Sequence, residues 1–226
     1  MHYYIISLMV SIVLKHGLIQ AHVFDSLILS SDEQSSFINL IPSIKTSSLL
    51  YRGSRDGFNA FSFHSKCDGI RNTITIVKNN LNYVFGGYTN STWSSSNPPK
   101  YMYDANAFIF TLNRNKNNSL FQKFLVNDRT KAIWCNAALG PTFGFWSGKQ
   151  NFSDIMIAFR NNVSSITGTP KYGNYADFGA SYSLPQGINY GSIESRKFLT
   201  GQFKQWEVSE IEVFLISQKL RKKIFK

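Results

Sequence analysis

Short runs of alternating apolar and polar residues, separated by turn-forming residues, fill the chain from Thr73 onward. The run Thr73–Val77 (TITIV) and the following NYVFGGYT flank a polar turn, which is typical of a β-hairpin. Further strand-like runs lie at 107–112, 131–137, 154–159 and 209–216. Because no strand–helix–strand alternation accompanies them, the pattern predicts a mainly β, α+β fold: an antiparallel β-sandwich with a few short flanking helices.

Two short helices are expected before these strands. In Ser30–Ile41 we expect Ser31 to cap a helix whose first turn carries two acidic residues and whose apolar residues share one face. A second helix is expected over about Asn59–Cys67, where the Asp68-Gly69 dipeptide provides a stop. The Gly86-Gly87 pair inside an aromatic strand indicates a bulge or a close approach of another chain segment.

The chain has 226 residues, of which 43% are hydrophobic, so it can bury a sizeable core. We expect one domain at 24–216, preceded by an apolar segment at 1–23 and followed by a basic tail at 217–226. The formal net charge of +11 concerns partners rather than fold. Outside the tail the positive charge is scattered, which argues against nucleic acid as a partner.

The N-terminal run YYIISLMVSIVL is too short to span a bilayer, which needs about 20 apolar residues. Residues 3–21 resemble a signal peptide with Ala21 as the cleavage residue, although no Lys or Arg precedes the apolar run. A buried strand, a short helix or a remnant linker explains the same residues equally well. Four N-x-S/T sequons acquire meaning only in a secreted chain, and they begin at Asn90, Asn117, Asn151 and Asn162.

The stretch YRGSRDGFNAFSFHSKCDG (Tyr51–Gly69) gathers residue types that active sites use. A Cys67–His64 nucleophile pair lies at helical spacing, but the sequence offers no group to orient the histidine, and cysteine is commonly buried. The two Asp-Gly dipeptides are turn formers, and Arg52 and Arg55 can pair with their carboxylates. No spacing indicates a metal site or a phosphate-binding loop, and no cofactor is expected.

Four tryptophans can either line a ligand surface or pack in the core, and aromatic burial favours the core. They are Trp93, Trp134, Trp146 and Trp206.

At this point the residues resemble a known family. The blocks LLYRGSRDGFNAFSFHSKCDG, NTITIVKNN, VFGGYTNSTWSSSN and DANAFIFTL, followed by GPTFGFW, DIMIAF, YGNYADFGASY and FLTGQFKQWEVSEIEVFLI, occur in the order seen in the TLDc domain. The resemblance covers roughly 24–216. It departs from the family pattern at Phe145 and Trp146, where a glycine is usual, and only about 23 residues precede the match.

The resemblance implies a β-sandwich without an established catalytic centre, a link to oxidative-stress protection, and binding to the vacuolar-type proton ATPase. It also implies that the motif residues are structural or face a partner. These residues are Arg52, Ser54, Asp56, Gly57, Phe63, His64, Cys67, Asp68, Gly69, Gly86, Gly87, Trp93, Trp206, Glu210 and Glu212. The family is mainly intracellular, which implies a cytoplasmic protein.

We therefore expect a non-enzymatic binding and regulatory module. Two alternatives stay open: a thiol-based antioxidant that acts through Cys67 or Cys135, and a secreted β-sandwich that binds a glycan or a protein. The first needs an exposed thiolate with a lowered pKa. The second needs the N-terminal run to act as a signal peptide.

Overall fold

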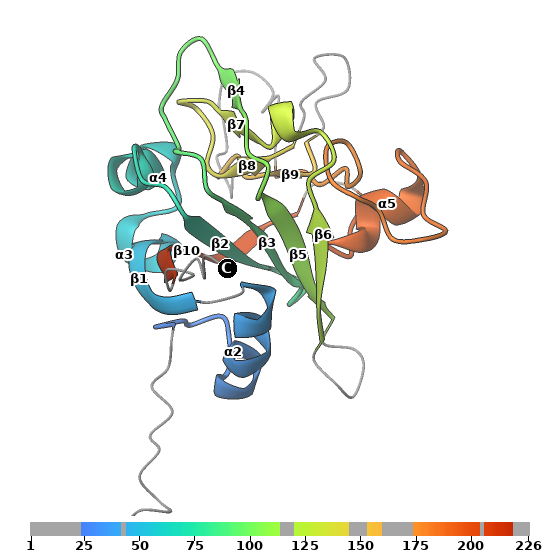
Figure 1. Cartoon of the computed structure of the whole chain (residues 1–226), viewed down its shortest axis with the longest axis horizontal. Helices are drawn as coiled ribbons and strands as arrows, with labels where there is room; N and C mark the ends of the chain where they lie inside the picture. Colours follow the sequence, from blue (N-terminus) through green and yellow to red (C-terminus); the bar gives the residue numbers. More distant parts are fainter. Residues whose placement is uncertain are drawn as a thin grey trace, which may run out of the picture.

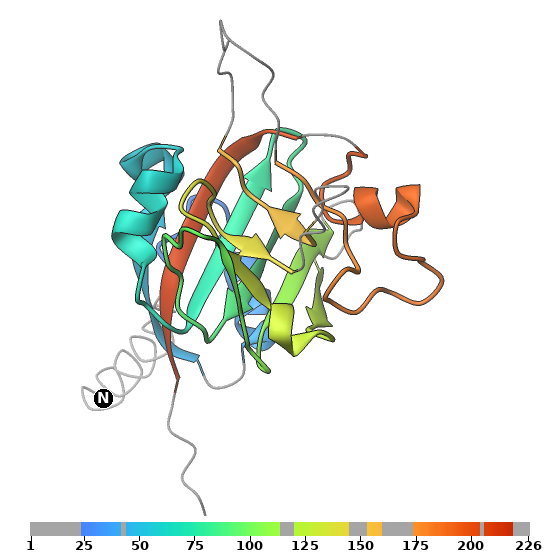
Figure 2. The ribbon, with the colours of Figure 1, turned by 90° about the horizontal axis from the view of Figure 1, so that it is seen from above.

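The computed structural model describes residues 24–41, 44–113, 120–144, 153–159, 174–203 and 206–218. Two antiparallel sheets stack on each other (Figures 1 and 2). The larger sheet has the order β1 (Ile44–Arg52), β10 (Val208–Gln218), β2 (Thr73–Asn79), β3 (Val84–Thr89), β5 (Phe108–Asn113) and β6 (Leu120–Leu125). The smaller sheet has the order β4 (Lys100–Met102), β7 (Ile133–Cys135), β8 (Thr142–Phe143) and β9 (Ile155–Met156). The predicted mainly β sandwich is confirmed.

The helices are short and lie around the two sheets (Figure 1). They are α2 (Ser31–Phe37), η1 (Ile38–Leu40), α3 (Gly53–Asp56), α4 (Ala60–Cys67), η2 (Arg129–Lys131) and α5 (Ile193–Phe198). Among the described helices, none has the length and apolar character needed to cross a bilayer.

The larger sheet is buried on both faces. Alternation along β10 sends Ile211 and Val213 toward the smaller sheet, into a core that also holds Phe63 and Trp93. Phe214 and Ile216 point to the opposite face, where they meet a second core. The covering element there is the segment Phe24–Ile41, which we call the N-terminal strap and which contains α2 (Figure 1). Glu212 therefore points beneath the strap and not into water.

The strap holds its place through aromatic contacts and a capped helix. Phe24 packs edge-on against Phe37 and Phe214 with ring centroids 5.2 and 5.1 Å apart. The prediction of Ser31 as the cap is wrong by one residue. Ser30 accepts from the backbone N–H of Glu33, whose carboxylate accepts from the Ser30 N–H, because a capping box needs the acid at the third helical position.

Gly86 and Gly87 mark a close approach, and the β2–β3 pairing stays regular through both residues. A Cβ on Gly87 would lie 2.6 Å from the ring of Phe143 in the smaller sheet. A Cβ on Gly86 would lie 2.0 Å from the Thr75 carbonyl oxygen. Gly87 thus lets the two sheets come together, whereas Gly86 allows close contact within the larger sheet.

The strands predicted around 73–77, 107–112 and 209–216 are confirmed as β2, β5 and β10. The runs at 131–137 and 154–159 contain only the short β7 and β9. The strand β1 was not predicted, because IKTSSLLYR lacks clean alternation. The segment 1–23 and most of the tail (219–226) lie outside the described residues, as do three of the four sequon asparagines.

Candidate functional site

The first motif block forms the turn between β1 and α4. Tyr51 is buried and donates its hydroxyl to the Gly57 carbonyl at 2.8 Å. The Arg52 N–H donates to Asp56 Oδ2 at 2.9 Å, and Gly57 has a φ of 97°, a conformation that glycine adopts without strain. These contacts fold the chain back at α3. The predicted Arg55–Asp56 pair is present at 2.8 Å on the surface of this turn.

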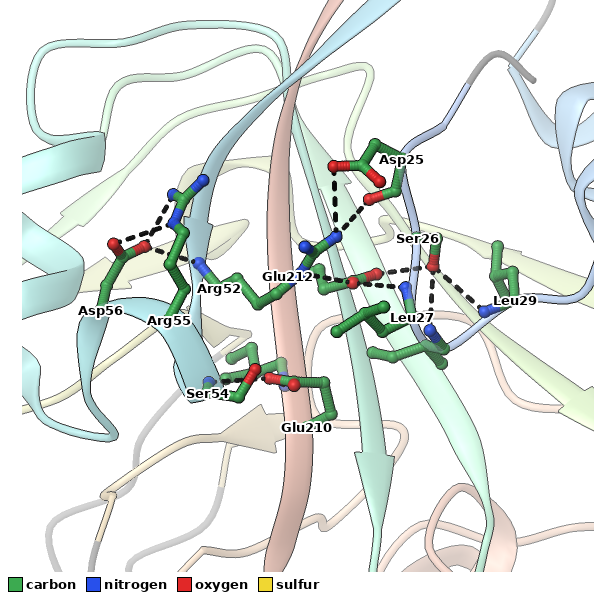
Figure 3. Close-up of polar contacts among 12 residues, drawn as sticks. Asp25, Ser26, Leu27, Leu29, Arg52, Ser54, Arg55, Asp56, Glu210 and Glu212 are labelled. Carbon is green, nitrogen blue, oxygen red and sulfur yellow. Dashed lines mark hydrogen bonds and ion pairs between the residues drawn. The ribbon is translucent and has the colours of Figure 1, made fainter. Parts of the chain in front are cut away.

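Glu212 is the hub of this block, and Figure 3 shows its contacts. Its carboxylate is fully buried and accepts from Arg52 Nε at 2.9 Å, from the Ser26 hydroxyl at 2.6 Å and from the Leu27 N–H at 2.8 Å. Ser26 and Leu27 belong to the strap, whereas Arg52 and Glu212 belong to neighbouring strands. One carboxylate therefore fastens three segments that are far apart in sequence.

The guanidinium of Arg52 also reaches the strap directly. It donates to the Asp25 carbonyl and lies 3.6 Å from the Asp25 carboxylate. The sequence predicted that the Arg52 side chain pairs with the turn carboxylates of Asp56 and Asp68. This prediction is wrong, because only the Arg52 backbone N–H reaches Asp56. Glu212 takes the guanidinium because both side chains lie on the face of the larger sheet that the strap covers.

Glu210, two residues earlier on β10, accepts from the Ser54 N–H at 3.2 Å (Figure 3). Burial raises the pKa of the Glu212 carboxyl, while Ser26, Leu27 and Arg52 act to lower it. The pKa of Asp56 is lowered, chiefly by its hydrogen bond from Arg55. The carboxylates of this block are thus committed to joining backbone segments.

The second motif block is helix α4, which Asn59 caps by accepting from the Ser62 N–H at 2.8 Å. Phe63 and Cys67 lie one turn apart and are both fully buried against the inter-sheet core. Phe63 contacts Trp93 edge-on at 5.5 Å. Gly69 follows the helix with a φ of 76° and donates its N–H to the Trp93 carbonyl at 3.0 Å. This confirms the predicted stop.

His64 is buried between α4 and the turn that follows β7. Its Nδ1 lies 2.7 Å from Asp68 Oδ1, and its Nε2 lies 3.0 Å from the carbonyl oxygens of Asn136 and Leu139. Asp68 is the orienting group that the sequence did not reveal. Both ring nitrogens thus face oxygen acceptors and not the Cys67 sulfur, so His64 ties the helix to the smaller sheet.

Both thiols are buried. Burial raises the pKa of Cys67 far above its ordinary value, and the carboxylates of Asp68 and Asp56 raise it further. Burial also raises the pKa of Cys135, and neither residue forms a disulfide. A thiolate nucleophile is therefore disfavoured at both positions.

The described tryptophans pack in the interior. Trp93 donates its indole N–H to Thr73 at 2.9 Å, and Trp206 contacts Phe85 edge-on at 5.0 Å. Trp134 is also buried, whereas Trp146 and its neighbour Phe145 lie outside the described residues. The core interpretation is confirmed for these three residues.

Two buried carboxylates were not predicted from the sequence. Asp154 has no exposed surface and accepts from the N–H groups of Gly179, Ala180 and Ser181 at 2.7–3.0 Å. Asp104 accepts from the Thr89 hydroxyl at 2.8 Å and the Asn90 N–H at 2.5 Å. The surrounding sequences, YMYDANA for Asp104 and NFSDIMI for Asp154, carry no signal of such a role.

The motif residues form two clusters of contacts, one around Glu212 and one around His64, and Gly87 lies where the two sheets approach each other. In both clusters the potentially reactive side chains have a partner or are buried. Within the described residues, no cluster of three or more His, Cys, Asp or Glu side chains is placed to hold a metal ion. Through these contacts the motif residues join chain segments that are far apart in sequence.

Two comparisons with known proteins bear on this architecture. A family model for the TLDc domain matches residues 22–217, nearly the whole chain. No match was found among curated proteins.

Proposed function

The chain belongs to the TLDc domain family, and from that premise we propose that it acts as a non-catalytic binding and regulatory module. One observation carries the proposal: the motif residues that resemble catalytic groups serve the fold. His64 and Asp68 bind each other and neighbouring backbone groups, and Glu212 binds Arg52 and the strap. A domain whose reactive side chains are committed in this way acts through its surface.

The vacuolar-type proton ATPase is the partner that we propose, together with a role in protection from oxidative stress. Both follow from the family resemblance. A direct test is binding of the purified full chain to purified ATPase, measured by pull-down with antibodies against individual subunits. We expect recovery of defined ATPase subunits. If no ATPase subunit were recovered in the pull-down, the ATPase would be ruled out as the partner. The proposal of a binding module would then apply to other partner proteins.

The non-catalytic part has its own test, peroxide consumption by the purified protein. The buried thiols with raised pKa support the expectation that consumption equals that of a Cys67→Ser, Cys135→Ser double variant. A drop in consumption on removal of the thiols would restore the antioxidant alternative. Thermal unfolding of the double variant serves as the folding control.

A further inference from the structure

The larger sheet has two edge strands, β1 and β6, and only one of them has a regular edge. The pairing of β1 with β10 shifts register at two places, and such irregularities hinder the addition of another strand. The strand β6 has six residues without proline and pairs with β5 in one continuous register. The edge strands of the smaller sheet, β4 and β9, have three and two residues. Among the described strands, β6 is therefore the edge best suited to accept another strand.

The backbone groups of β6 point alternately toward β5 and toward the open side. The Val126 N–H donates at 3.2 Å to the residue that precedes β5, whereas the Leu125 carbonyl points away from β5 and accepts from the Ser183 N–H at 2.9 Å. By this alternation the N–H and C=O groups of Phe121 and Lys123 also point away from β5. Within the described part of the chain, no group pairs with them. The first half of β6 thus presents a row of open donors and acceptors.

The lysine on this edge does not protect it. Natural edge strands often carry a lysine whose charge opposes the approach of another strand. The Lys123 ammonium lies instead over the sheet face, where it donates to the Leu40 carbonyl at 2.8 Å and lies 3.9 Å from the centroid of the Phe108 ring. Phe121 is held on the same face, with its ring centroid 5.0 Å from that of Phe37. The side chains beside the open backbone groups are therefore already fixed on the face that the strap covers.

We infer that β6 pairs with β6 of a second copy of this chain, antiparallel, about a two-fold axis at Gln122. In this register Phe121 lies opposite the partner's Lys123, the two residues exchange two N–H···O bonds, and the axis repeats the pair. The Phe121 ring then packs beside a lysine stem. Gln122 is exposed and meets its own counterpart on the other face, where an amide can both donate and accept.

The strand itself selects this register. Backbone bonds form only where outward-facing residues lie opposite each other, so the register can change only in steps of two residues. A step in one direction places Lys123 opposite the partner's Lys123, which sets like charges together, and brings the partner strand to Leu125, whose carbonyl Ser183 already occupies. A step in the other direction leaves Phe121 as the one outward-facing residue of β6 that pairs within β6. The register centred on Gln122 uses both outward-facing residues of the open edge.

This inference goes beyond the proposed function and does not depend on it. The contact is one short strand long, and stable dimers bury about 1,000 Å² or more. We therefore expect a weak dimer, with a Kd of about 10–100 µM.

Sedimentation equilibrium of the purified full chain at about 5–500 µM measures this Kd. The variant Lys123→Pro removes an outward N–H and places a ring on the edge, while the bonds to β5 stay intact. Its matched control, Lys123→Ala, loses the same side chain and keeps the N–H. We expect the Kd to rise at least about thirtyfold in Lys123→Pro and at most about fivefold in Lys123→Ala. Thermal unfolding shows whether both variants are folded.

Disulfide trapping provides a second measurement that does not need the proline variant. Gln122→Cys places a thiol on the axis beside its counterpart, within the Cα separation of about 4.4–6.8 Å that a disulfide needs. Leu125→Cys is the control, because Leu125 is exposed on the same strand but would lie about 20 Å from its counterpart. Both native cysteines are buried. Under mild oxidation we expect a covalent dimer from Gln122→Cys and none from Leu125→Cys.

A chain that stays monomeric up to about 500 µM would overturn the inference. Equal Kd values for Lys123→Pro and Lys123→Ala, or equal cross-linking of the two cysteine variants, would also overturn it, because the contact would then lie elsewhere. A monomer that loses recovery of ATPase subunits on the change Lys123→Pro would assign the edge to a strand of the ATPase instead. The dimer assays contain no ATPase, so their failure is distinct from a failure of the proposed function.

Discussion

The two sheets each bury a carboxylate completely, and they stabilise it by different means. Glu212 in the larger sheet has the guanidinium of Arg52 at 2.9 Å, a hydroxyl and an N–H. Asp154, directly before β9 of the smaller sheet, has three backbone N–H groups from 179–181. The first arrangement joins distant segments through charge. The second shapes one loop through geometry, so the two should respond differently to mutation, although burial raises the pKa of both carboxyl groups.

Removing the cation should have the largest effect. In Arg52→Ala the Glu212 carboxylate stays buried without its counter-charge, a loss that costs about 3–5 kcal/mol in comparable pairs. We expect that decrease in the free energy of unfolding by urea, with faster hydrogen exchange at Leu27. Arg55→Ala is the control, because its pair with Asp56 is exposed and worth at most about 1 kcal/mol. Equal losses in the two variants would contradict the role of burial.

The double variant Arg52→Met, Glu212→Leu sharpens this result. It removes both charges and fills the space with apolar groups, so we expect it to recover part of the stability that Arg52→Ala loses. The recovery is incomplete because the Leu27 N–H and the Ser26 hydroxyl lose their acceptor. Recovery of stability without protection of the Leu27 amide would show that the charges serve to fix the strap. A double variant as unstable as Arg52→Ala would argue that the pair itself is strongly stabilising.

Asp154→Ala should come next in size. It leaves three N–H groups without their acceptor, and each buried orphan costs about 1–3 kcal/mol, less where water enters. We expect a loss of about 2–4 kcal/mol in urea unfolding, with exchange increased at 179–181 and unchanged at Leu27. An increase at Leu27 of the same size would mean that the two sheets unfold as one unit.

The pH dependence separates the fully buried carboxyl group of Asp154 from the partly exposed one of Asp56, which accepts from Arg55. Burial raises the pKa of Asp154 to about 7, whereas Arg55 lowers the pKa of Asp56. Because unfolded aspartate titrates near about 4, the Asp154 contribution is full below that pH and is lost as pH rises through about 7. The Asp56 contribution is present above about pH 4 and is lost as pH falls.

Urea unfolding between about pH 5 and 8 tests this sign. We expect Asp154→Asn to flatten the decline of stability toward high pH, because the amide does not ionise. An Asp56→Asn variant should leave that part of the profile unchanged and lose stability at every pH above about 5. If the pH profile of Asp154→Asn matched that of the wild type, the Asp154 carboxylate of the wild type would be charged in the folded chain, stabilised by its three N–H donors.

The smallest effect is expected at a carboxylate that is partly exposed. Asp68 holds His64 at 2.7 Å and the Ser95 N–H at 2.7 Å, and its side chain is 28% exposed. Water can replace part of what is lost, so we expect Asp68→Asn to cost about 1 kcal/mol in thermal unfolding. A loss as large as that of Arg52→Ala would show that exposure does not set the ranking.

Much of the larger sheet could be predicted because the residue pattern within each strand and the adjacent turn is enough to identify the strand. The alternation around Ile211 and Val213, the hairpin of β2 and β3, and the stop at Gly69 each follow from adjacent residues. The strand β1 could not be predicted, because its sequence is largely polar and its partner β10 lies over 150 residues away. A pattern within one segment does not reveal which segment will pair with it.

The site was predicted as a set of residues but not as a set of contacts. The Arg52–Glu212 and His64–Asn136 contacts join segments 160 and 72 residues apart, so no spacing indicates them. The burial of Glu212 was equally hidden. Alternation placed Glu212 on the face of β10 opposite to Ile211. That face is buried because the strap covers it, which the pattern of β10 alone does not show.

The position of β10 has a consequence for synthesis on the ribosome. This strand is the last of the sheet to be made, yet it lies between β1 and β2, which do not pair with each other. Until residues 208–218 have emerged, β1 has no partner in the larger sheet, and β2 exposes one edge. Completion of the larger sheet therefore waits until β10 has been synthesised, and β1 and one edge of β2 stay unpaired while the intervening segments emerge.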